Sequence, residues 1–212
     1  LGWTHGYAMA LRNASSNCCV WSSYDILVNT STPHTPSGMM ANREGYSETR
    51  KIYDSYASSN IENIKSTFPA AYYAIKFKDI VSPPLASSGW FLPSIGQLYD
   101  ASVNLVGMSK DVSTMTDNGN GWFFGYNSSN PLAGVGEANI DKYLSNAAAL
   151  NVSVDYFTTS TIDIVWASSQ YNESQCYLWQ IEATSGTFCL YHLVRDLSGA
   201  PRRCFVRPVI AF

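Results

Sequence analysis

The sequence predicts an α+β fold in one domain over residues 1–212, with helices first and a compact antiparallel sheet last. Apolar residues recur at helical spacing in several segments before residue 150. From residue 162 onward they alternate in short β-branched and aromatic runs bounded by turn residues. The length of 212 residues suits a single domain, and no internal repeat or low-complexity tract divides it.

The helical prediction rests on capping residues and apolar spacing. Ser94 and Gln97 form an S-x-x-Q capping box directly after Pro93, and helical spacing then continues to Val106, with Gly107 as the stop. Other helices are expected over 47–58, from Ser59 (with Glu62 completing its capping box) to an interruption at Pro69, over 70–77, and over 137–150.

Strands are expected mainly after residue 160. The segment 162–166 is rich in β-branched residues, 177–182 alternates, Gly186 turns the chain, and 188–194 returns it. A closing strand over 205–210 contains Pro208, which implies an edge or a bulge. One more strand is expected over 7–11, whereas 29–45 and 109–136 have the composition of loops.

The sequence argues against nucleic-acid binding and against a membrane-spanning segment. The net charge of -3 argues against nucleic-acid binding, which needs a basic footprint. No apolar run reaches the roughly 18–20 residues that a membrane span requires. With 14 tyrosines and only 14% charged residues, the chain suits a surface that contacts ligands through Tyr, Ser and Asn. It begins without a basic signal-peptide segment, so we expect the C-terminal part of a longer, processed surface protein.

Motifs for catalysis and for metal binding are missing from the sequence. It contains no HExxH, GxSxG or Walker motif, and its three histidines are scattered. Cys189 and His192 lie three positions apart, which on a strand places them on opposite faces, so we interpret this pair as coincidence. Five cysteines without CxxC spacing indicate free or buried thiols rather than a disulfide scaffold. We therefore expect no cofactor, no metal and no enzymatic activity.

Three phrases of the sequence resemble signatures of a known family when they are taken in order. They are Gly89–Ser94 (GWFLPS), Trp166–Asn172 (WASSQYN) and Val206–Phe212 (VRPVIAF). They resemble the C-type-lectin-like domains found in surface and fimbrial adhesins of Bacteroides-type gut bacteria. The resemblance covers nearly the whole chain and implies helices packed on a small antiparallel sheet with long irregular loops.

A closer resemblance is to the variable proteins of diversity-generating retroelements, whose C-terminal region is rewritten by adenine-directed mutagenesis. It rests on Tyr171–Asn172, Tyr177, Trp179, Gly186–Phe188 and Val206–Val209. The chain departs from that pattern at Cys176 and Tyr177, where the family has Ala-Trp, and at Phe205, which replaces an arginine. The resemblance implies a variable region at about 166–212. Asparagine, the residue that such mutagenesis replaces, is absent after Asn172.

Strand alternation within this region predicts a ligand-binding face. Trp179, Ile181 and Phe188 are expected to face the core, so the intervening side chains are expected to face solvent. The competing interpretation is that some of them fill a second small core. The predicted ligand-binding residues are Ser174, Gln175, Leu178, Gln180, Glu182, Thr184, Thr187, Cys189, Tyr191, His192 and Arg195.

Three functions follow as hypotheses. The first is an adhesin or display domain at the cell surface that binds a protein or glycan on a cell, phage or host surface. The second is a structural pilus subunit without an exogenous ligand, whose partners are other pilus subunits. The third is an enzyme similar to formylglycine-generating enzymes, for which Cys176, Cys189 and Cys204 are the only candidate residues.

Overall fold

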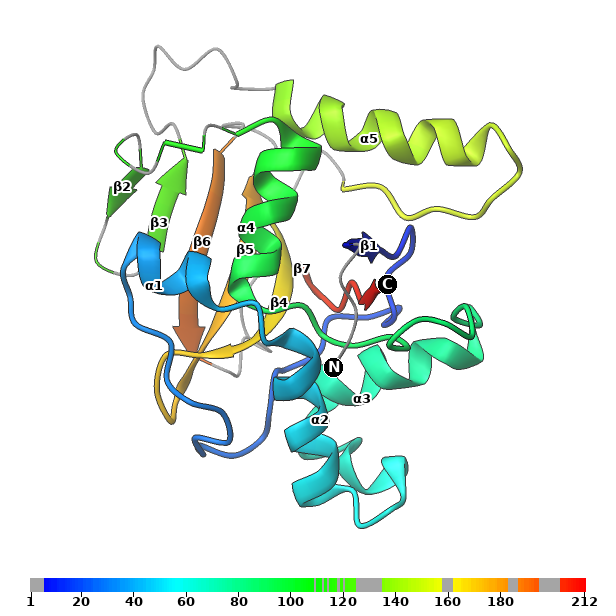
Figure 1. Ribbon diagram of the computed structural model, residues 1–212, viewed down its shortest axis with the longest axis vertical. Helices are drawn as coiled ribbons and strands as arrows, with labels where there is room; N and C mark the ends of the chain where they lie inside the picture. Colours follow the sequence, from blue (N-terminus) through cyan, green and yellow to red (C-terminus); the bar gives the residue numbers. More distant parts are fainter. Residues whose placement is uncertain are drawn as a thin grey trace.

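The computed structural model describes residues 6–212 except 109, 112, 114, 118, 120, 125–134, 158–161, 183–186 and 195–202. Its class is α+β, as predicted (Figure 1). The helices are α1 (Pro36–Ala41), α2 (Gly45–Tyr56), α3 (Pro69–Lys76), α4 (Ile95–Ala101) and α5 (Val135–Ala148), with 3₁₀ turns η1 (Ile61–Ile64) and η2 (Phe77–Asp79) and a π-helical turn η3 (Ser102–Val106).

Six strands form the main sheet in the order β2-β3-β6-β5-β4-β7, and β1 pairs with β8 in a separate ladder. The strands are β1 (Tyr7–Met9), β2 (Met115–Asp117), β3 (Gly121–Phe124), β4 (Ile162–Gln170), β5 (Gln175–Glu182), β6 (Thr187–Val194), β7 (Arg203–Phe205) and β8 (Val209–Ala211). The expectation of a purely antiparallel sheet is wrong, because β7 runs parallel to β4. The sheet is therefore mixed.

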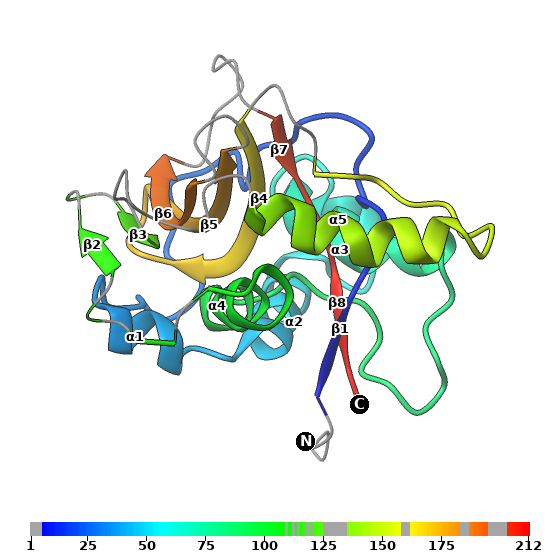
Figure 2. The ribbon, with the colours of Figure 1, turned by 90° about the horizontal axis from the view of Figure 1, so that it is seen from above.

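Both faces of the sheet are covered. On one face, Val165, Tyr177 and Trp179 pack in a cluster with residues of α4, α5 and Met39 of α1. On the other face, Trp166 and Leu178 pack in a second cluster with Trp21 of the N-terminal segment and with residues of α2 and α3. Figure 2 shows α1 and α4 against one face of the sheet, with β1 and β8 side by side beyond its far end. Central strands covered in this way are buried on both faces.

The capping box at Ser94 is confirmed. Its hydroxyl accepts from the Gln97 N–H, while the Ser94 N–H donates to Oε1 of Gln97 at 2.8 Å. The helix ends as predicted at Gly107, which adopts the left-handed conformation with φ +88°. The predicted helix from Ser59 is only the turn η1, capped by Asn60 instead. Pro69 begins α3, a position that suits its fixed φ and its missing N–H.

Three short elements lie in segments that the composition assigned to loops. Helix α1 begins where Thr35 accepts from the Gly38 N–H and Pro36 takes the first helical position. Strands β2 and β3 lie within 109–136 and extend the sheet beyond β6. The predicted closing strand is two strands, since β7 ends before Pro208 and β8 pairs with β1. The predicted turn at Gly186 lies outside the described residues.

Within the described residues, no helix combines the length and the apolar character needed to cross a bilayer.

Candidate ligand-binding surface

A group of rings gathers where the β2–β3–β6–β5 part of the sheet meets the loop before α1. Cross-strand pairing places His192 of β6 directly opposite Tyr177 of β5. The Tyr177 hydroxyl donates to the carbonyl of Thr32 at 3.1 Å, which holds the 32–34 loop against the sheet. We call this group the histidine–aromatic surface, and its members are His34, Asp117, Trp122, Tyr171, Tyr177 and His192.

The two imidazole rings are the centre of the histidine–aromatic surface. The ring centroids of His34 and His192 lie 4.4 Å apart, with the planes perpendicular. Tyr171 stacks on His192 with centroids 4.1 Å apart. His34, Trp122 and Tyr171 are partly exposed, whereas Tyr177 and His192 are buried beneath them. The group therefore presents aromatic edges and faces to solvent over a buried polar floor.

Several polar atoms of this surface lack hydrogen-bond partners among the described residues. Both ring nitrogens of His34 and of His192, together with Nε1 of Trp122, are buried without a partner in that part of the chain. Nε2 of His34 lies 3.5 Å from Oδ1 of Asp117, an ion-pair distance without hydrogen-bond geometry. Burial, with His34 as the next contribution, lowers the pKa of His192 to about 4, although Asp117 acts in the opposite direction. His192 is therefore neutral at pH 7.

The turn between β4 and β5 presents two of the predicted site residues beside this surface. Oδ1 of Asn172 accepts from the backbone N–H groups of Ser174 at 2.9 Å and Gln175 at 2.8 Å. Nδ2 of Asn172 donates to Oε1 of Gln175 at 2.9 Å. Ser174 and Gln175 remain partly exposed, and His192 lies nearby under Tyr171. The structure thus brings three predicted residues to one region.

The expected exposure of Leu178, Gln180 and Cys189 is wrong. Leu178 and Cys189 have no exposed surface, and Gln180 is 8% exposed. The physical reason is that strict alternation separates core from solvent only when one face of a sheet is solvated. Here Leu178 packs in the second core cluster, opposite the face that holds Trp179. The second-core interpretation is therefore correct for Leu178.

Tyr191 is half-buried on the face opposite His192, and it lies over Gly121 of β3. A Cβ atom at Gly121 would lie 2.1 Å from Cδ2 of Tyr191, so the absence of a side chain there makes room for the ring. Thr184 and Arg195 lie outside the described residues, and the structure describes only the backbone of Glu182 and Thr187.

The WASSQ phrase of β4 is structural. Nε1 of Trp166 donates to the carbonyl of Cys19 at 2.8 Å. Oε1 of Gln170 accepts from the N–H groups of Val28 and Asn29, both at 2.9 Å, and so fixes the N-terminal segment on the sheet. Ser168 and Ser169 are fully buried and donate to the carboxylate of Glu48 in α2. No local pattern in the sequence identifies Glu48, because only the folded chain brings it to β4.

Arg207 of the VRPV phrase is also part of the scaffold. It is 1% exposed and donates to Oδ1 of Asn13 at 3.0 Å and to the carbonyl of Asp155 at 2.7 Å. Its guanidinium lies 4.1 Å from the ring centroid of Phe157. Burial lowers the pKa of Arg207 to about 10, with acidic neighbours opposing the shift. The phrase thus joins the N-terminal segment to the segment that follows α5.

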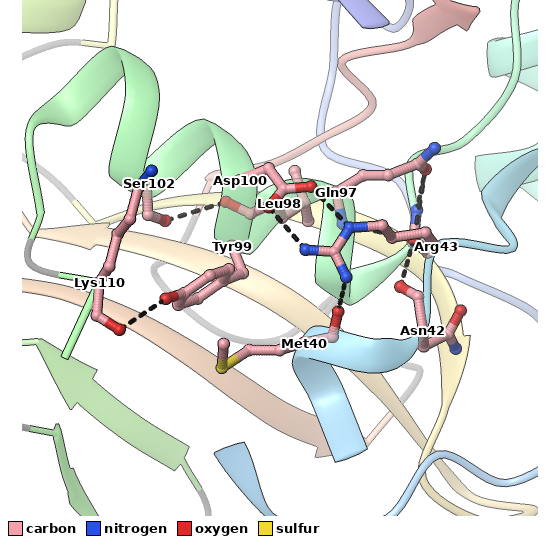
Figure 3. Close-up of polar contacts among 10 residues, drawn as sticks. Met40, Asn42, Arg43, Gln97, Leu98, Tyr99, Asp100, Ser102 and Lys110 are labelled. Carbon is pink, nitrogen blue, oxygen red and sulfur yellow. Dashed lines mark hydrogen bonds and ion pairs between the residues drawn. The ribbon is translucent and has the colours of Figure 1, made fainter. Parts of the chain in front are cut away.

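Helices α1 and α4 are joined directly (Figure 3). Nε and Nη2 of Arg43 donate to the two carboxylate oxygens of Asp100 at 2.9 and 2.8 Å. Arg43 also donates to the carbonyl of Met40 at the end of α1. Gly96 allows the helices to approach so closely that its N–H donates to the carbonyl of Asn42 at 3.0 Å. These contacts hold α1 against α4 on the face of the sheet that both helices cover.

The described part of the chain holds no group of three or more His, Cys, Asp or Glu side chains placed to bind a metal ion. Among the described residues none of the five cysteines is joined in a disulfide, and Cys176, Cys189 and Cys204 are buried. Burial raises the pKa of the Cys19 thiol to about 12, so this thiol is protonated at pH 7.

Comparison with known proteins shows the fold. No family model matches the chain, and no curated protein matches it. The structure is similar to the crystal structure of a fimbrial protein from Bacteroides ovatus ATCC 8483, with a TM-score of 0.50 and 15% sequence identity. The match covers 98% of this chain and 36% of that protein, so this chain spans about a third of its length. The chain has a fimbrial-type fold.

Proposed function

We propose that this chain is the ligand-binding domain of a cell-surface adhesin, with a C-type-lectin-like scaffold that presents the histidine–aromatic surface to a protein or glycan target. The observation that carries the proposal is the gathering of partly exposed His34, Trp122 and Tyr171 around buried ring nitrogens that no described residue hydrogen-bonds. Aromatic side chains provide much of the binding energy at protein interfaces. The similarity to a fimbrial protein supports a location at the cell surface.

In this proposal only some residues of the predicted variable region contact the ligand. Ser174, Gln175 and the edge of Tyr171 contact the ligand, whereas Leu178 and Cys189 support the fold from within. Diversification of the region 166–212 is part of the same proposal. A near-copy of its codons in the neighbouring DNA, differing only at adenines, would establish it, and codons without such a copy would argue against it.

The surface is tested by removing two of its rings. The double variant Trp122→Ala/Tyr171→Ala should bind at least about tenfold more weakly to any target that the native chain selects from a protein and glycan array. Its melting temperature should fall by only a few degrees, because both side chains are partly exposed. Tyr24→Ala, which removes an exposed ring elsewhere, is the control. Unchanged binding by the double variant would exclude this surface.

A second candidate, a pilus subunit that receives a strand from its neighbour, is favoured by the free edge of β1. Gly6 accepts from the Phe212 N–H, and the Ala10 N–H donates to the Pro208 carbonyl, so residues 6, 8 and 10 pair toward β8. The backbone groups of Tyr7 and Met9 consequently point away from β8. They border a cavity of about 560 Å³ that β1 shares with α4 and α5.

On this second candidate, Met9→Pro should stop polymer formation by the full-length protein without unfolding the domain. Proline removes the outward N–H of Met9 and is tolerated on an edge strand. Electron microscopy of assembled fibres reports the result, and Tyr143→Ser, which changes only an exposed side chain at the mouth of the cavity, is the comparison. Normal fibres from Met9→Pro would reject β1 as the receiving edge.

A further inference from the structure

A second cavity lies between residues 29–33, the end of α1 and the start of α2, and Thr32 in its lining contacts Tyr177 of the histidine–aromatic surface. Its volume is about 430 Å³. Its lining combines apolar surface, from residues such as Pro33 and Ala41, with the polar side chains of Asn29, Thr32, Asn42, Glu44, Glu48 and Lys51. We call it the Glu48 cavity.

Glu48 is a buried carboxyl group in the wall of this cavity. Its exposed fraction is 8%. Oε1 accepts from Nδ2 of Asn42 at 2.9 Å, and Oε2 accepts from the hydroxyls of Ser168 and Ser169. These donors are neutral, and the carboxylate has no ion pair among the described residues. A buried carboxylate is normally balanced by a cation or neutralised by a proton.

The same wall holds a second acceptor that no described residue bonds. Asn29 is 4% exposed, and its Nδ2 donates to the carbonyl of Ser168 at 3.1 Å. Its Oδ1 is buried and has no hydrogen-bond partner in the part of the chain that the structure describes. A buried acceptor left in this state is costly, and a ligand that carries N–H or O–H groups removes the cost.

We propose that the Glu48 cavity binds a primary ammonium group, with Glu48 and Asn29 as its acceptors. An ammonium group supplies one positive charge and three donors. It therefore matches the uncompensated carboxylate and the unused amide oxygen together, with a hydroxyl such as that of Thr32 as a third partner. The described residues of the cavity include no group of three or more His, Cys, Asp or Glu side chains placed to bind a metal ion.

Two sources present this ammonium chemistry to a surface protein, namely a lysine side chain of a protein and an amino sugar. Lys51 lines the same cavity and is an internal competitor, but it is exposed and forms no ion pair with Glu48 in the described structure. Burial raises the pKa of Glu48. Acidification therefore protonates the carboxylate earlier than usual and weakens ammonium binding.

The test is an NMR titration of the full chain with methylammonium at pH 7. We expect saturable amide shifts around Asn29 and Glu48, and about tenfold weaker binding by Glu48→Gln, which keeps the shape and removes the charge. Tetramethylammonium, which has no N–H donors, should not bind. Lys51→Met should bind methylammonium as tightly as the native chain or more tightly. Separate titrations with glucosamine and with Nα-acetyl-lysine amide identify the source, and N-acetylglucosamine controls for the sugar ring.

Absence of saturable shifts would overturn the proposal, as would equal binding by the native chain and Glu48→Gln. Weaker binding by Lys51→Met would also overturn it, since Lys51 would then be part of the site rather than a competitor. Methylammonium binding should persist in Trp122→Ala/Tyr171→Ala. A negative result for ligand binding at the histidine–aromatic surface can therefore be distinguished from a negative result for ammonium binding in the Glu48 cavity.

Discussion

Glu48→Ala is expected to lower the free energy of unfolding by about 2–4 kcal/mol. The substitution removes the acceptor of Asn42, Ser168 and Ser169 and leaves a void between α2 and β4. Buried donors without partners each cost on the order of 1–3 kcal/mol, although such costs are not additive. Urea denaturation followed by tryptophan fluorescence measures the effect. A loss below about 1 kcal/mol would show that the serine hydroxyls find other acceptors.

Glu48→Gln is the matched control, and it also separates charge from shape. The amide keeps one acceptor oxygen. The free energy of unfolding of Glu48→Gln at pH 7 should therefore stay within about 1 kcal/mol of the native value. Because burial raises the pKa of Glu48 in the folded chain, the folded state binds this proton more tightly than the unfolded state does. The contribution of Glu48 to stability is therefore largest below its ordinary pKa of 4.5 and declines as pH rises through the raised value. Glu48→Gln should lack this decline.

Gly96→Ala should destabilise the fold by about 2–4 kcal/mol, although alanine normally stabilises a helix by about 1 kcal/mol relative to glycine. A Cβ atom at Gly96 would lie 2.3 Å from the carbonyl oxygen of Asn42 and 2.9 Å from that of Met39. Both neighbours are backbone atoms, so the overlap is relieved only by moving α1 away from α4. That movement also strains the Arg43–Asp100 ion pair shown in Figure 3.

The measurement for Gly96→Ala is the melting temperature together with the urea midpoint. Ser145→Ala, on the exposed side of α5, controls for helix propensity and should change stability by less than about 0.5 kcal/mol. A gain in stability from Gly96→Ala would mean that the α1–α4 approach is looser than the structure shows.

The candidate surface was predictable from sequence only in part. Ser174, Gln175 and His192 belong to the predicted set and lie together in the structure. Within the histidine–aromatic surface, His34 and Trp122 come from distant segments with loop-like composition. No local pattern connects these two residues with His192. Strand alternation predicts exposed side chains for Leu178 and Cys189, and both are buried. Alternation identifies the two faces of a strand but does not say whether other elements cover each face.

Elements whose signals act within a few residues could be predicted directly from the sequence. The Ser94–Gln97 capping box, the stop at Gly107 and the α+β order are of this kind, because caps, left-handed glycines and apolar periods depend on neighbours in the chain. Tertiary structure alone decided which strand faces are buried and which side chains meet Glu48. Those outcomes depend on α2, α4 and the N-terminal segment packing on both faces of the sheet, contacts between segments far apart in the chain that no local pattern encodes.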